Sequence, residues 1–327
     1  MEFTHIPHLK TDVSRIGLGT WAIGGWMWGG TEEQKAISTI QRALENGINL
    51  IDTAPVYGFG KSEEIVGKAL KQYGNRERVV LATKVGLNWK NQQVFRDSSK
   101  KRIMQEIEDS LRRLQVDYID LYQVHWPDPQ TPFAETANAL DQLLKEGKIR
   151  AIGVSNYTVE DMKIFQKTAP IDAAQPPFNL FEKEAEQTIL AYCKKMHLAT
   201  VGYGSLCRGL LSGKMRQDVQ FQGDDLRKSD PKFQKPRYSQ YLECVKRLDQ
   251  WAQQNYRCSV LSLAIRWVLD MGIDVALWGA RQPEQLDAIS TVWGWKLKAE
   301  DFKAIDDILN ETISMPVGPE FMAPPVQ

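Results

Sequence analysis

Short apolar runs alternate with amphipathic stretches along most of the chain. Between the runs, apolar residues recur at spacings of three and four, as in Ile37, Ile40 and Leu44, which predicts helices that bury one face. The runs themselves are too short for helices and predict strands. They cover residues 15–19, 49–52, 78–84, 118–125, 149–155, 172–175, 199–204 and 274–279.

Three local signals predict where particular helices begin. Thr31-x-x-Gln34 and Thr158-x-x-Asp161 have the spacing of a capping box, in which the threonine hydroxyl and the later side chain satisfy free backbone amides. Pro132 predicts the first turn of a helix, because the backbone N–H that proline lacks would have no hydrogen-bond partner within the helix at that position.

Eight strands that alternate with helices predict parallel β-α-β units, and eight such units can close into a barrel. No shift in composition marks a second domain. We therefore predict the α/β class: a single (β/α)8 TIM barrel over residues 1–327, with an N-terminal β-hairpin over 3–14 and extra helices. Helical stretches are expected near 239–254 and 259–270, before the eighth strand. The Pro-rich tail GPEFMAPPVQ either lies over the barrel or hangs free.

Charge and composition narrow the range of partners. The 327 residues contain 41 Lys and Arg against 41 Asp and Glu, so no basic field attracts nucleic acid or an anionic membrane. No signal sequence and no apolar run long enough to span a membrane is present. Four cysteines lie far apart without a C-x-x-C pair, which favours a reducing compartment. We expect a cytoplasmic monomer that acts on small molecules.

Four chemically distinctive residues stand at the ends of adjacent predicted strands. Asp52, Lys84 and His125 end the second, third and fourth strands, and Tyr57 follows the second. Strand ends of a barrel lie side by side, so these groups can converge. We expect the Lys84 ammonium to lower the pKa of Tyr57, Asp52 to hold Lys84, and His125 to bind an oxygen next to the phenol. Each residue alone has a structural explanation, but the four together favour a site that protonates a carbonyl oxygen.

Two loops offer a place for phosphate groups. No G-x-G-x-x-G sequence opens a helix after an early strand, so a Rossmann site is not expected. The loops after the seventh and eighth strands, over 203–214 and 279–285, instead combine glycines, backbone amides and cations. Barrels commonly hold phosphates there, although an ordinary surface loop has similar residues.

Aromatic residues gather in the loops on the same side of the barrel. Five of them predict an aromatic-walled substrate pocket above Tyr57: Trp21, Trp26, Trp28, Trp89 and Trp126. We expect small aldehydes and 2-oxoaldehydes as substrates. The excursion over 221–241 is polar and basic, and is either a solvated loop or a flap over the cofactor, with Arg227 near a phosphate. No metal-ligand spacing occurs.

Several motifs resemble the signature of the aldo-keto reductase family over essentially the whole chain. Lys84 within ATK, His125 after DLYQV, and GVSN at 153–156 match that pattern, and GSLCRGLLSGKM resembles the bacterial general-stress-protein branch. The longest match is Asp52-Thr-Ala-x-x-Tyr57-Gly-x-Gly-x-Ser62-Glu63-x-x-Val66-Gly67. The resemblance implies NADPH-dependent reduction of aldehydes and ketones, with Tyr57 as the general acid, and a role in stress response.

The resemblance also implies a set of residues that bind NADPH. Ser155, Asn156 and Gln175 would bind the nicotinamide amide, Tyr203 would stack on its ring, and Arg281 would hold the adenosine phosphate. The full set is Thr20, Trp21, Asp52, Ser155, Asn156, Gln175, Tyr203, Gly204, Ser205, Leu206, Arg208, Gly209, Lys214, Arg227, Gly279, Ala280, Arg281 and Gln285. Three departures from the family pattern are Gly204-Ser205 for Ser-Pro, Trp278 for Pro, and Ile289 for an Asn that contacts adenine.

Two other functions remain open. The potassium-channel β subunits are similar to aldo-keto reductases and act through a partner, so a redox-sensing regulatory protein with the same residues is conceivable. No recognisable partner-binding extension supports it. A barrel hydrolase or isomerase would need a metal site or paired carboxylates, which the sequence does not show.

Overall fold

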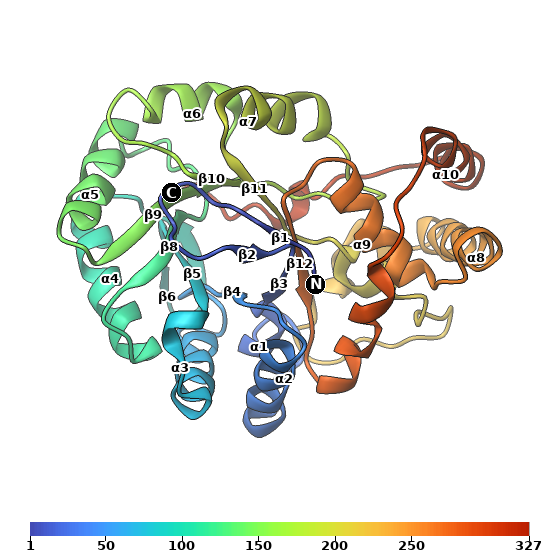
Figure 1. The fold of residues 1–327 in the computed structure, drawn as a ribbon, viewed down its shortest axis with the longest axis horizontal. Coiled ribbons are helices and arrows are strands. Elements are labelled where there is room, and N and C mark those ends of the chain that lie inside the picture. The colour runs from blue at the N-terminus through green and yellow to red at the C-terminus, as the bar shows by residue number, and fades with distance from the viewer. Residues whose placement is uncertain (327) are drawn as a thin grey trace.

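The computed structural model describes residues 1–326 and contains a closed barrel of eight parallel strands (Figure 1). The strands lie in the order β10-β11-β12-β3-β4-β5-β8-β9 around the ring. They are β3 (Ile16–Gly19), β4 (Leu50–Asp52), β5 (Val80–Val85), β8 (Ile119–Val124), β9 (Ile149–Ser155), β10 (Ala173–Gln175), β11 (Ala199–Gly202) and β12 (Val275–Gly279). The eight strands predicted from the apolar runs are thus confirmed, with shifts of one or two residues at their ends.

Helices follow the strands and form an outer ring around them (Figure 1). Those of the ring are α2 (Glu33–Glu45), α3 (Lys61–Tyr73), α4 (Lys100–Leu114), α5 (Phe133–Lys145), α6 (Val159–Phe165), α7 (Ala191–Met196) and α9 (Val260–Asp270). A short α1 (Trp21–Gly24) follows β3, and the extra helices α8 (Arg237–Tyr256) and α10 (Ala299–Thr312) lie beside each other at one edge. The (β/α)8 barrel prediction is therefore confirmed.

The N-terminal hairpin closes one end of the barrel. Strands β1 (Phe3–Thr4) and β2 (Val13–Ser14) pair antiparallel, as predicted for residues 3–14. The Ser14 amide donates to Asn49 Oδ1 just before β4, which places the hairpin at the amino ends of the strands. Ile6 and Leu9 pack in the same buried cluster as Leu50 and Leu277 inside the barrel. The carboxyl ends of the strands are therefore the open end.

The three predicted helix starts have different outcomes. Thr158 and Asp161 form the predicted capping box at the start of α6. The prediction for Thr31 is wrong: α2 begins at Glu33, and Glu32 precedes it without a side-chain cap. Arg281 donates to the carbonyls of Trp28 and Gly30, and this contact from a distant loop fixes the chain just before Thr31. Pro132 is the cap residue immediately before α5.

A second hairpin was not predicted from the sequence. Strands β6 (Leu87–Lys90) and β7 (Gln93–Arg96) pair antiparallel directly after β5. Their two-residue turn is Asn91-Gln92, with φ of 50° and 64°. Two-residue turns of this kind are normally recognised in a sequence by an Asn-Gly or Asp-Gly pair. Here Gln replaces the glycine in the second position, so the sequence did not indicate the turn. The hairpin carries Leu87 and Val94 to the open end of the barrel.

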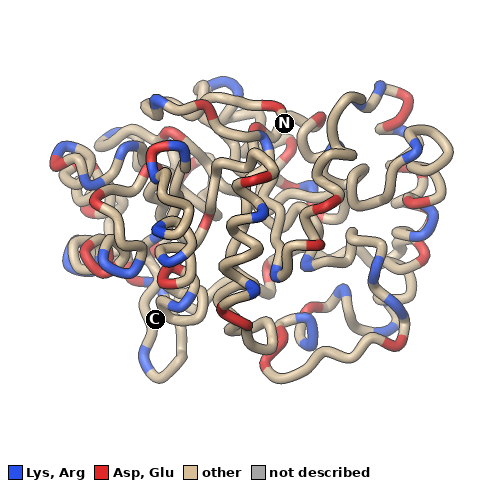
Figure 2. Tube along the Cα trace, turned by 60° about the horizontal axis from the view of Figure 1, so that its bottom comes forward, with Lys and Arg blue, Asp and Glu red and all other residues tan. Residues whose placement is uncertain are grey.

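The surface carries both signs of charge in small, interspersed groups, as Figure 2 shows along the Cα trace. This agrees with equal numbers of basic and acidic residues in the sequence. No helix within residues 1–326 is both long enough and apolar enough to cross a membrane.

Candidate active site

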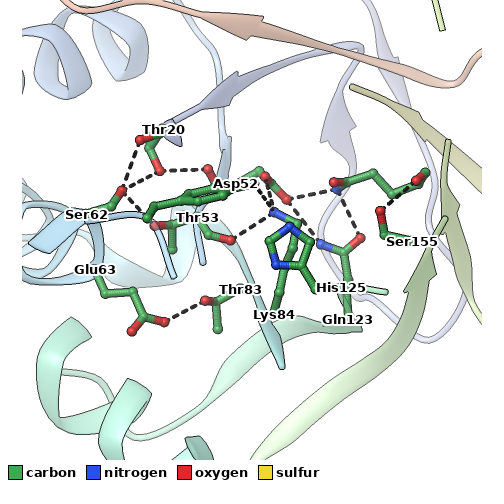
Figure 3. Close-up of polar contacts among 12 residues, drawn as sticks. Thr20, Asp52, Thr53, Ser62, Glu63, Thr83, Lys84, Gln123, His125 and Ser155 are labelled. Carbon is green, nitrogen blue, oxygen red and sulfur yellow. Dashed lines mark hydrogen bonds and ion pairs between the residues drawn. The ribbon is translucent and has the colours of Figure 1, made fainter. Parts of the chain in front are cut away.

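Lys84 lies at the centre of a compact polar cluster at the carboxyl ends of β4 and β5 (Figure 3). Its Nζ atom is 2.6 Å from Asp52 Oδ2, 3.0 Å from the Thr53 carbonyl oxygen and 3.2 Å from Tyr57 Oη. These contacts use all three hydrogens of the ammonium. Since Tyr57 Oη accepts a hydrogen bond here, the hydroxyl's own hydrogen stays available for another acceptor.

Two glutamines fix the Asp52 carboxylate from the other side. Gln123 and Gln175 donate to Asp52 Oδ1 over 3.1 Å and 2.9 Å, and Gln175 also donates to Gln123 Oε1 over 3.1 Å. Gly153 leaves room for this, because a Cβ there would lie 2.7 Å from Gln123 Cγ. Sequence reasoning missed Gln123, although an amide flanked by Leu121, Tyr122 and Val124 in the predicted strand was a usable signal.

The Tyr57 hydroxyl is a weaker acid in this structure than the sequence led us to expect. Burial, together with the charge of Asp52, raises the pKa of Tyr57 well above its ordinary value. The expectation that Lys84 lowers this pKa is therefore wrong for the protein alone. The reason is that burial disfavours the phenolate, and the negative charge of Asp52, which pairs directly with Lys84, raises the pKa of Tyr57 further. The phenol consequently keeps its proton at neutral pH, as a general acid must.

His125 follows β8 and faces Tyr57 across the open end of the barrel. The two rings meet edge to face, with centroids 5.6 Å apart. Burial and the nearby charge of Lys84 hold the pKa of His125 well below its usual value. The imidazole is therefore neutral near pH 7, with one nitrogen as donor and the other as acceptor.

This neutral histidine predicts a pH-dependent loss of stability. The unfolded chain takes up a proton at His125 below about pH 6.5, while the folded protein does not, so folding stability falls as the pH drops. Between about pH 7 and pH 5 we expect wild type to lose roughly 2 kcal/mol more than His125→Asn. Urea unfolding of both proteins at the two pH values measures this. Equal losses would mean that His125 becomes protonated within the folded protein.

Two adjoining cavities open around Tyr57. The first has a volume of about 450 Å³ and the second about 310 Å³, and Trp21, Tyr57 and Tyr203 line both. The predicted cofactor residues that line the first are Thr20, Trp21, Asp52, Tyr203, Gly204, Ser205, Leu206, Arg208, Gly209, Lys214, Arg227, Gly279, Ala280, Arg281 and Gln285. Ser155, Asn156 and Gln175 line the second. The fold thus brings the whole predicted set to one continuous site.

The cations of the first cavity differ in their surroundings. Arg281 donates to two backbone carbonyls and has no acidic partner among residues 1–326. Arg227 pairs with Asp225 and lies over the Trp28 ring, 5.2 Å from its centroid. Lys214 is exposed at the rim. The buried Trp28 Nε1 has no hydrogen-bond partner within the described part of the chain. Cations, glycines and a free donor fit the phosphates of a dinucleotide.

Arg208 lines the first cavity, but its charge is compensated by carboxylates within the protein. Its guanidinium is buried and lies 2.6 Å from Glu182 and 2.7 Å from Asp230. Lys232 completes the group through a 2.8 Å contact with Glu182. Two cations therefore face two carboxylates in the interior. Nothing in the sequence distinguishes this buried, paired arginine from an arginine that is free to bind a phosphate.

The excursion over 221–241 packs against the site, which favours the flap over the solvated loop. Asp224 accepts hydrogen bonds from the amides of Met27 and Gly29 over 2.7 Å and 3.0 Å. Arg227 lines the first cavity, and Leu226 and Ser229 line the second. The excursion thus forms part of the wall of each cavity.

The second cavity receives three of the five predicted tryptophans. Trp21, Trp26 and Trp126 line it, whereas Trp28 lines the first cavity instead. Trp89 lines neither and packs against Phe59. The tail residues 321–325 form another wall, so the Pro-rich tail lies over the barrel. Sequence reasoning missed that contribution, together with those of Met27, Val56, Leu87, Val94, Leu226 and Ser229.

Hydrogen bonds within the protein occupy most of the predicted nicotinamide-binding groups. Tyr203 Oη donates to Asn156 Oδ1 over 2.8 Å, and Asn156 Nδ2 donates to the His125 carbonyl and to Ser155 Oγ. Gln175 Nε2 is bound to Asp52 and Gln123. The carbonyl oxygen Oε1 is the part of the Gln175 amide left for a ligand.

Comparison with known proteins identifies the family. The model of the Aldo/keto reductase family matches residues 15–310. The chain belongs to this family. Aldo-keto reductase YhdN of Bacillus subtilis is 59% identical over all of this chain and 99% of its own length. The NADH-specific methylglyoxal reductase of Escherichia coli is 38% identical, covering 86% of this chain and 90% of its own. A solved glycerol dehydrogenase from Gluconobacter oxydans shares 52% identity and a TM-score of 0.89, covering 98% and 99% of the two chains.

Membership of this family makes the chain an NAD(P)H-dependent oxidoreductase that acts on carbonyl groups. The resemblance predicted from Asp52, Tyr57, Lys84 and His125 is thereby confirmed at the level of the family. The relatives named here are reductases and a dehydrogenase, and they lend no support to a partner-dependent regulatory protein.

Proposed function

We propose that the protein reduces small aldehydes and 2-oxoaldehydes to alcohols with NADPH. The observation that supports this most directly is the position of the Tyr57 hydroxyl, which lines both cavities and accepts a hydrogen bond from Lys84. Bound NADPH supplies the hydride. Loss of NADPH absorbance with a panel of aldehydes, run beside NADH, tests the proposal. A protein that oxidises neither coenzyme, or that reduces only bulky ketones, would contradict it.

In this proposal each residue of the cluster has one task. Tyr57 donates its proton to the carbonyl oxygen, and Lys84 stabilises the phenolate that remains. Asp52 keeps the ammonium aimed at the phenol. The neutral His125 donates a hydrogen bond to the same carbonyl oxygen and orients it. The residues of the first cavity would hold the coenzyme, with Arg227, Lys214 and Arg281 near its phosphates.

Selection of NADPH over NADH is assigned to Arg281. Its guanidinium carries two hydrogen bonds to carbonyls, which leaves further N–H donors for a phosphate. We expect Arg281→Ala to lower the ratio of kcat/KM with NADPH to kcat/KM with NADH at least about tenfold, because one charge-assisted contact is lost. Steady-state kinetics with both coenzymes measures this. Arg42→Ala, which removes an exposed arginine paired with Asp287, is the control. An unchanged ratio in Arg281→Ala would remove the assignment.

Three further expectations remain proposals. We propose that residues 1–327 act as one domain, as a monomer, and in the cytoplasm. All four cysteines are buried and free, and burial raises the pKa of each thiol, as suits a reducing compartment. Light scattering of the purified protein tests the oligomeric state.

A further inference from the structure

The two cavities differ sharply in charge. The first is lined by Lys35, Lys214, Arg227 and Arg281, together with acidic residues. The second has no Asp, Glu, Lys or Arg in its lining, as far as residues 1–326 show. His125, which does line it, is neutral because burial and Lys84 lower its pKa. The place where a carbonyl substrate would lie therefore offers no full charge at neutral pH.

Two cations that neighbour residues of this cavity's wall, Arg96 and Lys84, are already hydrogen-bonded within the protein. Arg96, two residues beyond Val94 on β7, donates to the carbonyls of Pro127 and Pro324 over 2.9 Å and 3.1 Å. It lies over the Trp126 ring, 5.2 Å from the centroid, and is not among the residues that line the cavity. The three hydrogens of Lys84 are used within the polar cluster.

The polar atoms in the cavity wall are also largely satisfied. Ser229 Oγ donates to the Leu226 carbonyl over 2.9 Å, and Ser155 Oγ donates to the Gln175 carbonyl over 2.8 Å. Asn156 makes three hydrogen bonds within the protein. What remains is mostly indole, aliphatic and proline surface. A carboxylate held there would lose its hydration and gain no ionic partner.

We propose that the second cavity selects uncharged, largely apolar carbonyl compounds and rejects those that carry a carboxylate or a phosphate. This inference rests on the proposed function and adds the substrate class to it. The charged side of the site would hold the coenzyme, and four residues line both cavities where the two sides meet: Trp21, Tyr57, Tyr203 and Met322. Selection then arises from the desolvation cost of an anion rather than from any specific contact with a neutral substrate.

A matched pair of substrates tests the proposal on the wild-type enzyme. 4-Carboxybenzaldehyde and 4-formylbenzamide have nearly the same size and differ in charge near neutral pH. We expect kcat/KM for the acid to be at least about 100-fold below that for the amide, mainly through KM, because the anion must shed its water without a partner. Equal values for acid and amide would overturn the inference and leave the reductase function intact. No turnover of benzaldehyde, amide or acid with either coenzyme would instead reject the proposed function.

A variant with a cation in the cavity provides the reverse test. Val94 lines the cavity from β7 at a partly exposed position. Val94→Lys should raise kcat/KM for the acid at least about tenfold relative to the amide, since it supplies the missing ionic partner. Val94→Met, of similar length and uncharged, should leave the ratio unchanged. A ratio that moves equally in both variants would show that shape rather than charge governs the discrimination. If Val94→Lys does not fold, the wild-type comparison still decides.

Discussion

Tyr57→Phe is expected to lower kcat by about 10²- to 10⁴-fold, the usual contribution of a positioned general acid. The phenol is the group of the polar cluster that borders both cavities and keeps a proton at neutral pH. Phenylalanine preserves the ring between Trp21 and His125 and removes only the hydroxyl. The dissociation constant for NADPH, measured by fluorescence titration, should stay within about threefold of wild type, since the coenzyme's phosphates are held elsewhere.

Tyr203→Phe is the matched control for this experiment. It removes a second buried hydroxyl from the same site, one that donates to Asn156 rather than accepting from Lys84. We expect kcat to fall less than about tenfold, because only a neutral positioning hydrogen bond is lost. If the two variants lost equal activity, or if Tyr57→Phe kept wild-type turnover, Tyr57 would not be the acid.

Arg208→Met is expected to destabilise the protein by about 3–5 kcal/mol, the cost of removing one partner from a buried ion pair. The side chain is almost fully buried between Glu182 and Asp230. Burial opposes ionisation of Glu182, and Arg208 with Lys232 nevertheless holds the pKa of this carboxyl below its usual value. Without Arg208, two buried carboxylates would face a single ammonium. Urea unfolding of the purified variants measures the loss.

Lys214→Met is the control, because Lys214 lines the same cavity but is exposed. We expect its unfolding free energy to stay within about 0.5 kcal/mol of wild type and its NADPH affinity to fall. A stable Arg208→Met protein with weakened coenzyme binding alone would contradict the structural role. It would favour the prediction made from the sequence, in which Arg208 binds the cofactor.

The buried ion group matters because it joins segments that the chain separates widely. Glu182 follows β10, Arg208 follows β11, and Asp230 and Lys232 belong to the excursion. Lys232 also donates to the Gly318 carbonyl over 3.0 Å, which ties in the tail. The Arg208 guanidinium lies 5.5 Å from the centroid of the Phe321 ring, which lines the second cavity. Loss of this group would therefore loosen walls of both cavities.

The barrel and the core of the candidate site could be predicted from the chain alone. Short apolar runs bounded by polar residues predict strands from local sequence alone. When eight such strands alternate with helices, few arrangements bury the apolar faces of all of them, and a closed barrel is one. Once a parallel barrel is accepted, Asp52, Lys84 and His125 must meet because they stand at adjacent strand ends. Neither step needs knowledge of which distant side chains touch.

Which distant residues pair with one another could be seen only in the tertiary structure. Arg208 and Arg281 look alike in the sequence and both line the first cavity, yet Arg208 pairs with two buried carboxylates and Arg281 donates to backbone carbonyls instead. The same holds for Trp28 and Trp126, which line different cavities, and for the tail, whose composition does not reveal the wall it forms. The pKa of Tyr57 is raised rather than lowered because burial disfavours the phenolate and the nearby Asp52 carboxylate adds a negative charge. The pattern of apolar and polar residues shows which residues lie near a strand end. The burial of a side chain and the energy of an ion pair depend instead on contacts across the whole fold.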